Sequence, residues 1–136
     1  MPGNLPSQVL FLIAELLRPD LGNKINIMGA FAAGQILVNP GTAFPVFLPF
    51  AIYSVFDGGD GKFKVRVRIS EQNGNPIIDS ADLPDAEKLP EAPMQMMINF
   101  NVLRFPSPGR YKVEIFLDNH VYANDISIRI SDKPII

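Results

Sequence analysis

The sequence contains no cysteine, no tryptophan and one histidine, His120. Without cysteine the chain has no thiol nucleophile, no thiolate metal ligand and no disulfide framework, which fits a reducing compartment. A single histidine without cysteine cannot provide the usual ligands of a zinc site, and no Gly-x-Ser-x-Gly motif positions a serine nucleophile. We therefore expect a protein that is not an enzyme and has no cofactor, with His120 serving as a turn residue.

Long membrane-spanning runs and an excess of basic residues are also lacking. The apolar run at residues 9–17 is far too short to span a bilayer, and no basic residues precede it as in a secretory signal. The formal net charge of −2 disfavours a general polyanion binder. We expect a soluble, cytoplasmic protein with no membrane partner and no nucleic-acid partner.

Alternating apolar and polar residues dominate what is present, which is typical of strands with one buried face. The length of 136 residues corresponds to about one domain, so we expect an N-terminal tail at residues 1–8 and a single domain at 9–136. The expected strands lie at residues 9–17, 24–31, 46–56, 62–70, 76–80 and 94–105 and in a hairpin within 106–130, with a short extended piece at 35–38.

Seven or eight strands with short turns predict an all-β fold. We favour an immunoglobulin-like antiparallel β-sandwich of seven to eight strands over a single sheet closed on itself. Tyr111 supports this choice, because a tyrosine that follows a Pro-Gly turn at the start of a strand resembles the tyrosine corner of such domains.

The last hairpin has the clearest alternation. Asn and His tolerate the positive φ of a tight turn, so we expect the turn at residues 119–120, which would place Val113 opposite Ile126. This register would also point Asn124 into the core. We therefore expect a bulge at Asn124 that turns Val121 inward instead.

Residues 24–31 predict a strand that buries Ile25, Ile27 and Phe31. Gly29 has the same parity as these residues. A missing side chain at that position indicates a bulge or the close crossing of another backbone.

Three further features predict local irregularities. Pro49 cannot donate a ladder hydrogen bond, so its strand should be at an edge or bulged there. The apolar parity of residues 94–105 changes near Val102, which predicts a second bulge. Residues 81–93 are acidic and rich in proline, and we expect them to form an exposed loop.

A family resemblance rests on three segments: Asn-Lys-Ile-Asn-Ile-Met-Gly-Ala-Phe at residues 23–31, Phe44-Pro45, and Phe-Pro-Ser-Pro-Gly-Arg-Tyr at residues 105–111, with Asp118 at the later turn. These segments resemble a bacterial family of small uncharacterised proteins with Gly-Lys-x-Asn-Ile-x-Gly-x-Phe near the start and Pro-Gly-x-Tyr before a last hairpin. The sequence departs from that pattern at Asn23 and His120. The resemblance covers most of the chain and implies an immunoglobulin-like sandwich, but no activity and no catalytic residue.

Two charged features suggest ligand sites. The acidic loop at residues 57–61 resembles half of a calcium loop, and residues 81–93 could add oxygen ligands, so a loop-based module that binds calcium or carbohydrate is our alternative hypothesis. A row of cations could meet phosphates, but protection of a sheet edge against pairing with other chains is the commoner role of such a row. The row consists of Lys62, Lys64, Arg66 and Arg68.

The remaining candidates are apolar residues on faces that should point outward. Phe47, Tyr53 and Val55 share the second parity of residues 46–56, and Phe116 lies outward in a charged strand. Either the tail or residues 32–44 cover them, or they form a contact surface for a protein partner or a second copy. We favour the contact surface, and thus a non-enzymatic interaction or structural module within a larger or self-associated assembly.

Overall fold

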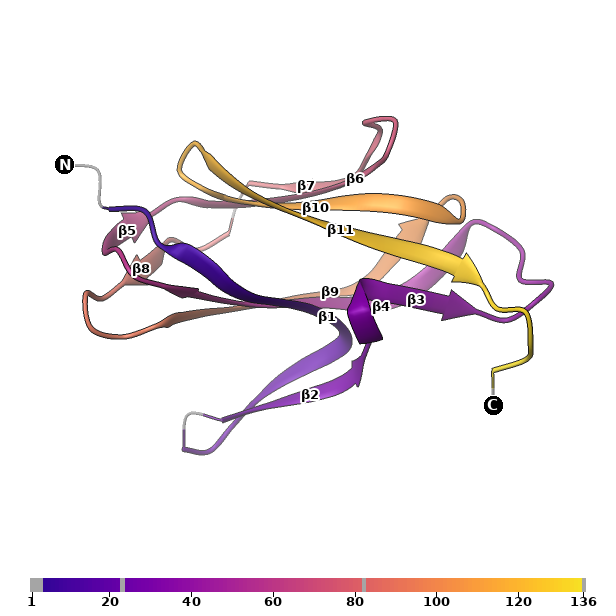
Figure 1. Ribbon diagram of the computed structural model, residues 1–136, viewed down its shortest axis with the longest axis horizontal. Coiled ribbons are helices and arrows are strands. Elements are labelled where there is room, and N and C mark those ends of the chain that lie inside the picture. Colours follow the sequence, from indigo (N-terminus) through magenta and orange to yellow (C-terminus); the bar gives the residue numbers. More distant parts are fainter. Residues whose placement is uncertain (1–3, 23, 82, 136) are drawn as a thin grey trace.

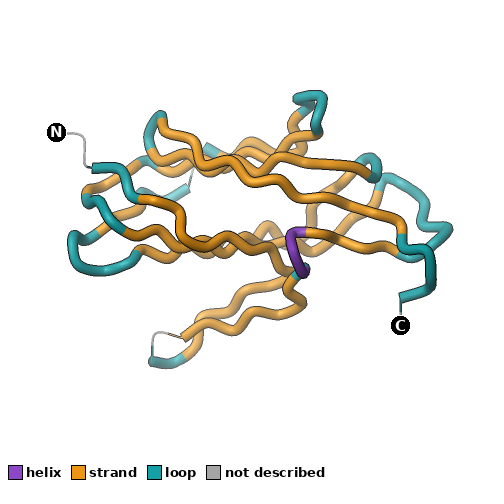
Figure 2. Tube along the Cα trace, in the orientation of Figure 1, coloured by secondary structure: helices purple, strands orange, loops and turns teal. Residues whose placement is uncertain are grey.

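The alternating segments of the sequence form strands that gather into two facing sheets (Figure 1). The computed structural model describes residues 4–22, 24–81 and 83–135. Within these residues the protein is all-β, and Figure 2 shows that its one helical segment is the short 3-10 turn η1 (Ala32–Gly34). No helix formed by this part of the chain has the length and apolar character needed to cross a membrane.

Eleven strands are present in the described residues. Sheet one has the order β2-β1-β4-β9, with all pairs antiparallel, and consists of β2 (Lys24–Ala30), β1 (Ser7–Asp20), β4 (Val46–Asp57) and β9 (Met94–Phe105). Sheet two has the order β3-β11-β10-β6-β7 and consists of β3 (Gln35–Val38), β11 (His120–Ile130), β10 (Gly109–Leu117), β6 (Val65–Glu71) and β7 (Pro76–Ser80). β3 runs parallel to β11, and the other pairs of sheet two are antiparallel. β5 (Gly61–Phe63) pairs with β8 (Ala86–Lys88) as a small third sheet.

The core lies between the two sheets, because inward side chains of both form one apolar cluster. Even-numbered residues of β4 point into it, as the alternation predicts, and Phe50, Ile52 and Phe56 are fully buried. Phe105 packs edge-on against Tyr111 at 5.2 Å between ring centroids. The Tyr111 hydroxyl donates to the carbonyl of Ser107, so the tyrosine corner expected from the sequence is formed.

The final hairpin is confirmed, but its predicted register is wrong. The turn is Asp118-Asn119, since Leu117 pairs with His120 and Val113 pairs with Asn124. Asp118 has the positive φ, at 53°. His120 is therefore the first residue of β11 rather than part of the turn.

Asn124 faces the core without the expected bulge, because its amide has a partner there. Asn124 Nδ2 donates to Gln8 Oε1 at 2.9 Å, and Gln8 Nε2 donates to the hydroxyl of Ser54 at 2.9 Å. The buried Ser54 hydroxyl donates in turn to the carbonyl of Leu10. A polar chain thus joins the two sheets, and Val121, expected inside, is 41% exposed.

The segment at residues 62–70 is two strands rather than one. Its inward residues alternate as predicted, but the chain changes partners at Lys64. The Lys64 main-chain N–H donates to Asp118 Oδ1, and the Asp118 N–H donates to the Lys64 carbonyl. These two bonds fix Lys64 against the turn, so β5 can leave sheet two and pair with β8.

The irregularities predicted at Pro49 and near Val102 are one and the same register shift between β4 and β9. The register shifts between Pro49 and Ala51, opposite Asn101, whose φ is +61°. β1 pairs with β4 only as far as Ala51, so Pro49 has a recorded strand neighbour on the β9 side alone. The missing N–H of Pro49 is therefore tolerated at a local edge.

β1 pairs with two different strands along its length. Residues Ser7 to Ala14 pair with β4, whereas Ala14 to Asp20 pair with β2. Residues 15–22 and 24–30, here called the arm, consequently leave the two layers and stand apart from them in Figure 1.

The burial predicted for Ile25 and Ile27 is wrong, because the arm stands away from the core. Ile27 is 39% exposed, whereas Ile25 and Phe31 are half-buried and only Phe31 packs against the main core. Gly29, at φ +63°, is closely approached by the Glu15 side chain, and no register shift is recorded between β1 and β2. The neighbour is therefore a side chain, in place of the expected bulge or backbone crossing.

Candidate interaction surface

The outer face of sheet one carries apolar residues in rows that cross three strands. Tyr53 on β4 lies between Leu12 on β1 and Met97 on β9, and Val55 lies between Leu10 and Gln95. The term outer face below means Leu10, Leu12, Phe47, Tyr53, Val55 and Met97. Exposure is highest at Phe47 (63%), Leu10 (44%) and Met97 (37%).

Three of the four residues expected in the contact surface lie on the same side of β4, although Phe47 is six residues away from Tyr53 along the strand. Phe47, Tyr53 and Val55 all point from β4 to the outer face, and the Tyr53 hydroxyl donates to Gln95 Oε1 at 2.8 Å. Neither the N-terminal residues nor residues 32–44 cover Phe47, which is well exposed. Tyr53 and Val55 are half-buried.

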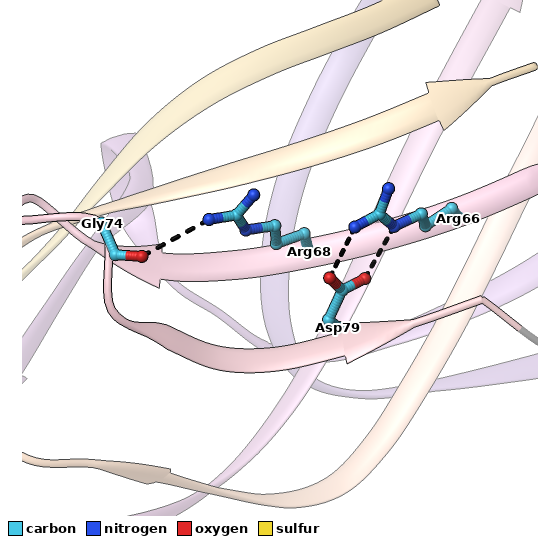
Figure 3. A network of polar contacts seen from close by, with 4 residues as sticks. All are labelled: Arg66, Arg68, Gly74 and Asp79. Atoms are coloured by element: carbon cyan, nitrogen blue, oxygen red, sulfur yellow. Dashed lines mark hydrogen bonds and ion pairs between the residues drawn. The ribbon is translucent and has the colours of Figure 1, made fainter. Parts of the chain in front are cut away.

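Phe116 belongs to a different surface, on the outside of sheet two. The Arg66 guanidinium lies 5.0 Å from the centre of its ring. Arg66 also binds Asp79 through two hydrogen bonds of 2.7 and 2.6 Å, and Arg68 donates to the carbonyl of Gly74 (Figure 3). The hydrogen bonds lower the pKa of Asp79 and raise that of Arg66. Arg66 is thus bound to β7, and Arg68 is bound to the turn that precedes β7. Because β6 lies between β10 and β7, these arginines do not protect a sheet edge, and that prediction was wrong.

The arm begins on the outer face, and sequence reasoning missed it. Leu17 is buried against Ala14 and Ala51, the two small residues of the adjacent row. The side-chain amide of Asn99 on β9 makes two bonds to Leu17, accepting from its N–H and donating to its carbonyl, both at 3.0 Å. The sequence does contain a signal for this contact: Ala14 and Ala51 are small residues in strands of otherwise bulky ones, and they leave room for Leu17.

Beyond its base the arm exposes further apolar side chains. Leu21 at the tip is 86% exposed, and Met28 on β2 is 45% exposed. The arm therefore extends the apolar surface away from the two layers.

The proposed calcium loops are arranged around an internal cation. Lys88, expected in an exposed loop, belongs to β8 and is 1% exposed. Its ammonium donates to the carbonyls of Leu89 (2.6 Å) and Gly59 (3.4 Å), so it uses oxygen ligands that a calcium ion would need. No cluster of three or more acidic or histidine side chains suited to a metal occurs in residues 4–22, 24–81 and 83–135. Asp82 lies outside the described residues.

His120 is exposed and stacks edge-on against Tyr122 at 4.7 Å between ring centroids. The Tyr122 hydroxyl donates to the carbonyl of Pro6, and burial raises the pKa of Tyr122. β11 and the N-terminal residues are thereby joined, and Asn4 also pairs with Asp60. Part of the expected tail, residues 4–8, thus lies against the domain, and β1 begins at Ser7.

These features define a small all-β protein of two facing sheets whose outer face on one side is apolar. The chain belongs to DUF6941, a family of unknown function, whose family model matches residues 9–131. No curated protein matches the chain. Membership confirms the expected resemblance to an uncharacterised family and adds no activity.

Proposed function

We propose that the protein is a non-enzymatic, cytoplasmic interaction module that forms part of a larger or self-associated assembly through the outer face of sheet one. The observation that carries the proposal is the row Leu12-Tyr53-Met97 beside Leu10 and Val55, an apolar surface on a sheet side that usually carries polar residues. Contiguous exposed apolar patches mark contact sites, and aromatic and methionine side chains are enriched in them.

The two outer faces of the molecule provide an internal comparison. The outside of sheet two carries Arg66, Arg68 and Asp79 in hydrogen bonds and an ion pair. On the outer side of sheet one, the central rows consist mainly of leucine, tyrosine, valine and methionine, and Gln95, Asn99 and Arg104 lie on β9 beside them. Solubility alone would favour charges on both sides, so the difference supports selection of one side for contact.

We further propose that the two sheets form an immunoglobulin-like sandwich. The order β1-β4-β9 corresponds to strands A, B and E of such a domain, and β11-β10-β6-β7 corresponds to G, F, C and C′. The tyrosine corner near the start of β10 is at the position expected for strand F. A far-ultraviolet circular dichroism spectrum dominated by helix would refute this assignment.

The experiment for the interaction role is light scattering of the purified protein at high micromolar concentration. We expect an oligomer or a copurifying protein, and loss of either when Leu10→Glu and Met97→Glu place charges on the outer face. Val121→Glu is the matched control, because Val121 is 41% exposed on β11 of sheet two. A strictly monomeric wild-type protein without a copurifying partner would refute the proposal, as would equal effects of all three substitutions.

A further inference from the structure

We infer that the free edge of β9 binds an extended, basic peptide segment by strand addition. β9 is the last strand of sheet one and pairs with β4 along one edge. Within the described residues no strand pairs with its other edge. This edge adjoins the outer face at Met97, which belongs to both, but the inference rests on main-chain groups of β9 and on Asp85 and Glu87. It therefore goes beyond the proposed function and can fail independently of it.

The backbone of β9 supplies the hydrogen-bonding groups. In an antiparallel strand, alternate residues direct their N–H and C=O groups toward opposite neighbours. Half of the residues in Met94 to Asn99 therefore present donors and acceptors to the side away from β4. An added strand satisfies such groups in register, which is the basis of peptide recognition by sheet edges.

Between Met94 and Asn99, before the bulge at Asn101, the edge lacks the features that normally prevent such pairing. Exposed edge strands are usually short, or carry lysine, proline or inward-pointing charges. β9 is 12 residues long, and residues 94–103 contain neither a charged residue nor a proline. By contrast, β7, an edge of sheet two, is 5 residues long and contains Pro76 and Asp79. The absence of protection at β9 is consistent with an edge that receives a partner.

A groove runs along this edge and sets the chemistry of the occupant. It has a volume of about 470 Å³ and is lined by residues 94–99 on one side and 83–87 on the other. The volume is within the roughly 300–1,000 Å³ of ligand sites. Met94, Met96 and Met97 supply flexible apolar contacts that adapt to different side chains.

The charge of the groove selects a basic segment. Asp85 and Glu87 line it, and no lysine or arginine does. Lys62 lies opposite Glu87 in the β5–β8 pair, but the one ion pair found among the described residues is Arg66–Asp79. A lysine or arginine of an added strand would therefore meet carboxylates that have no cationic partner.

The test is a nuclear magnetic resonance titration with a capped probe peptide, acetyl-Lys-Val-Lys-Val-Lys-Val-amide, at low ionic strength. We expect shifts confined to β9 and residues 83–87, and slower hydrogen exchange of those β9 amides that point away from β4. Asp85→Lys should weaken binding at least fivefold. Glu91→Lys, a reversal at an exposed residue that does not line the groove, should leave the affinity unchanged.

Two peptide controls separate strand addition from nonspecific attraction. A probe with glutamate in place of lysine should not bind, because the groove is acidic. Two further probes carry N-methyl groups, one on the odd-numbered residues and one on the even-numbered residues of the peptide. At least one of them should lose binding, because methylation removes the N–H groups that would donate to β9. No binding of the lysine probe, equal binding of the glutamate probe, or full binding of both methylated probes would overturn the inference. The Leu10→Glu variant should bind the probe like wild type, which separates this outcome from that of the proposed function.

Discussion

Lysine side chains are rarely buried completely, because taking an ammonium out of water is costly unless acceptors surround it. Lys88 is among the largest fully buried side chains of the protein, and its recorded acceptors are two main-chain carbonyls. It joins the loop containing Gly59 to the chain after β8. Its role is thus to close one end of the two layers.

Removal of this side chain gives the first prediction. Lys88→Ala would leave a cavity and two carbonyls without their donor, so we expect the free energy of unfolding to fall by about 2–4 kcal/mol. Lys62→Ala, an exposed lysine in the strand paired with β8, should change it by less than about 0.5 kcal/mol. Urea unfolding monitored by circular dichroism measures both. Equal effects of the two substitutions would show that burial of Lys88 is unimportant.

We expect the free energy of unfolding to fall at alkaline pH because of Tyr122. Burial raises the pKa of its phenol above the value near 10 of an unfolded chain, so folding favours the neutral form. The corresponding stability is fully present below about pH 10 and is lost as the pH rises through the pKa of the folded state.

The second prediction follows from this sign. At pH 7, Tyr122→Phe should destabilise the protein by about 1 kcal/mol, because it removes the hydrogen bond to the Pro6 carbonyl. Between about pH 9.5 and 11 the variant should lose less stability than wild type. Urea midpoints across this range test both parts. If the stability of Tyr122→Phe fell with pH as steeply as that of the wild type, Tyr122 would not be the source of the pH dependence.

At the scale of elements, the arm is the least supported part of the described fold. The first half of β1 pairs with β4 and buries Ile13 in the core, whereas its second half pairs with β2 alone. Asn99 holds the base of the arm by two bonds to the main chain of one residue, Leu17. Elements with few buried contacts open more readily than the core, so this latch should control the mobility of the arm.

The third prediction concerns the latch. Asn99→Ala should increase hydrogen exchange of the Leu17 amide, whose N–H is then left without its acceptor. The expected loss of local stability is about 1–2 kcal/mol. Asn26→Ala, at an exposed asparagine of β2, should leave exchange at Leu17 unchanged. Unaltered protection of Leu17 in Asn99→Ala would exclude the latch.

The strands themselves could be predicted from alternation, because a buried face imposes a two-residue period wherever it occurs. The bulge between β4 and β9 was also predictable, since Pro49 and the change of parity near Val102 are both local signals of it. The arm and the burial of Lys88 were not, because they depend on contacts with residues distant in sequence, such as Asn99 and Gly59.

The candidate surface, too, could be predicted only as far as single strands. Parity placed Phe47, Tyr53 and Val55 on one face of a strand, and that grouping is present. Their neighbours Leu12 and Met97 come from other strands and required knowledge of the sheet order. Phe116 has the right parity for exposure but lies in the other sheet.

The whole molecule depends on how the two sheets are joined. Most of that contact is apolar, with Phe56 meeting Tyr122 edge-on at 4.9 Å between ring centroids. The exception is the polar chain from Asn124 through Gln8 to Ser54, which also fixes the register of the final hairpin. A buried polar group is costly only when it loses its partner, so the chain makes one alignment of the sheets preferable to its neighbours.

This alignment gives the last prediction. Asn124→Leu or Gln8→Leu alone should destabilise the protein by about 1–2 kcal/mol, because each leaves an unpaired amide between the sheets. The double variant should be less destabilised than the sum of the two, with a coupling of about 1 kcal/mol, because both partners are then apolar and Ser54 still donates to Leu10. The Tyr53–Gln95 pair is the matched control: its hydrogen bond is exposed, so the cycle of Tyr53→Phe with Gln95→Leu should show almost no coupling. Additive effects at Gln8 and Asn124 in urea unfolding would mean that apolar packing alone aligns the two sheets.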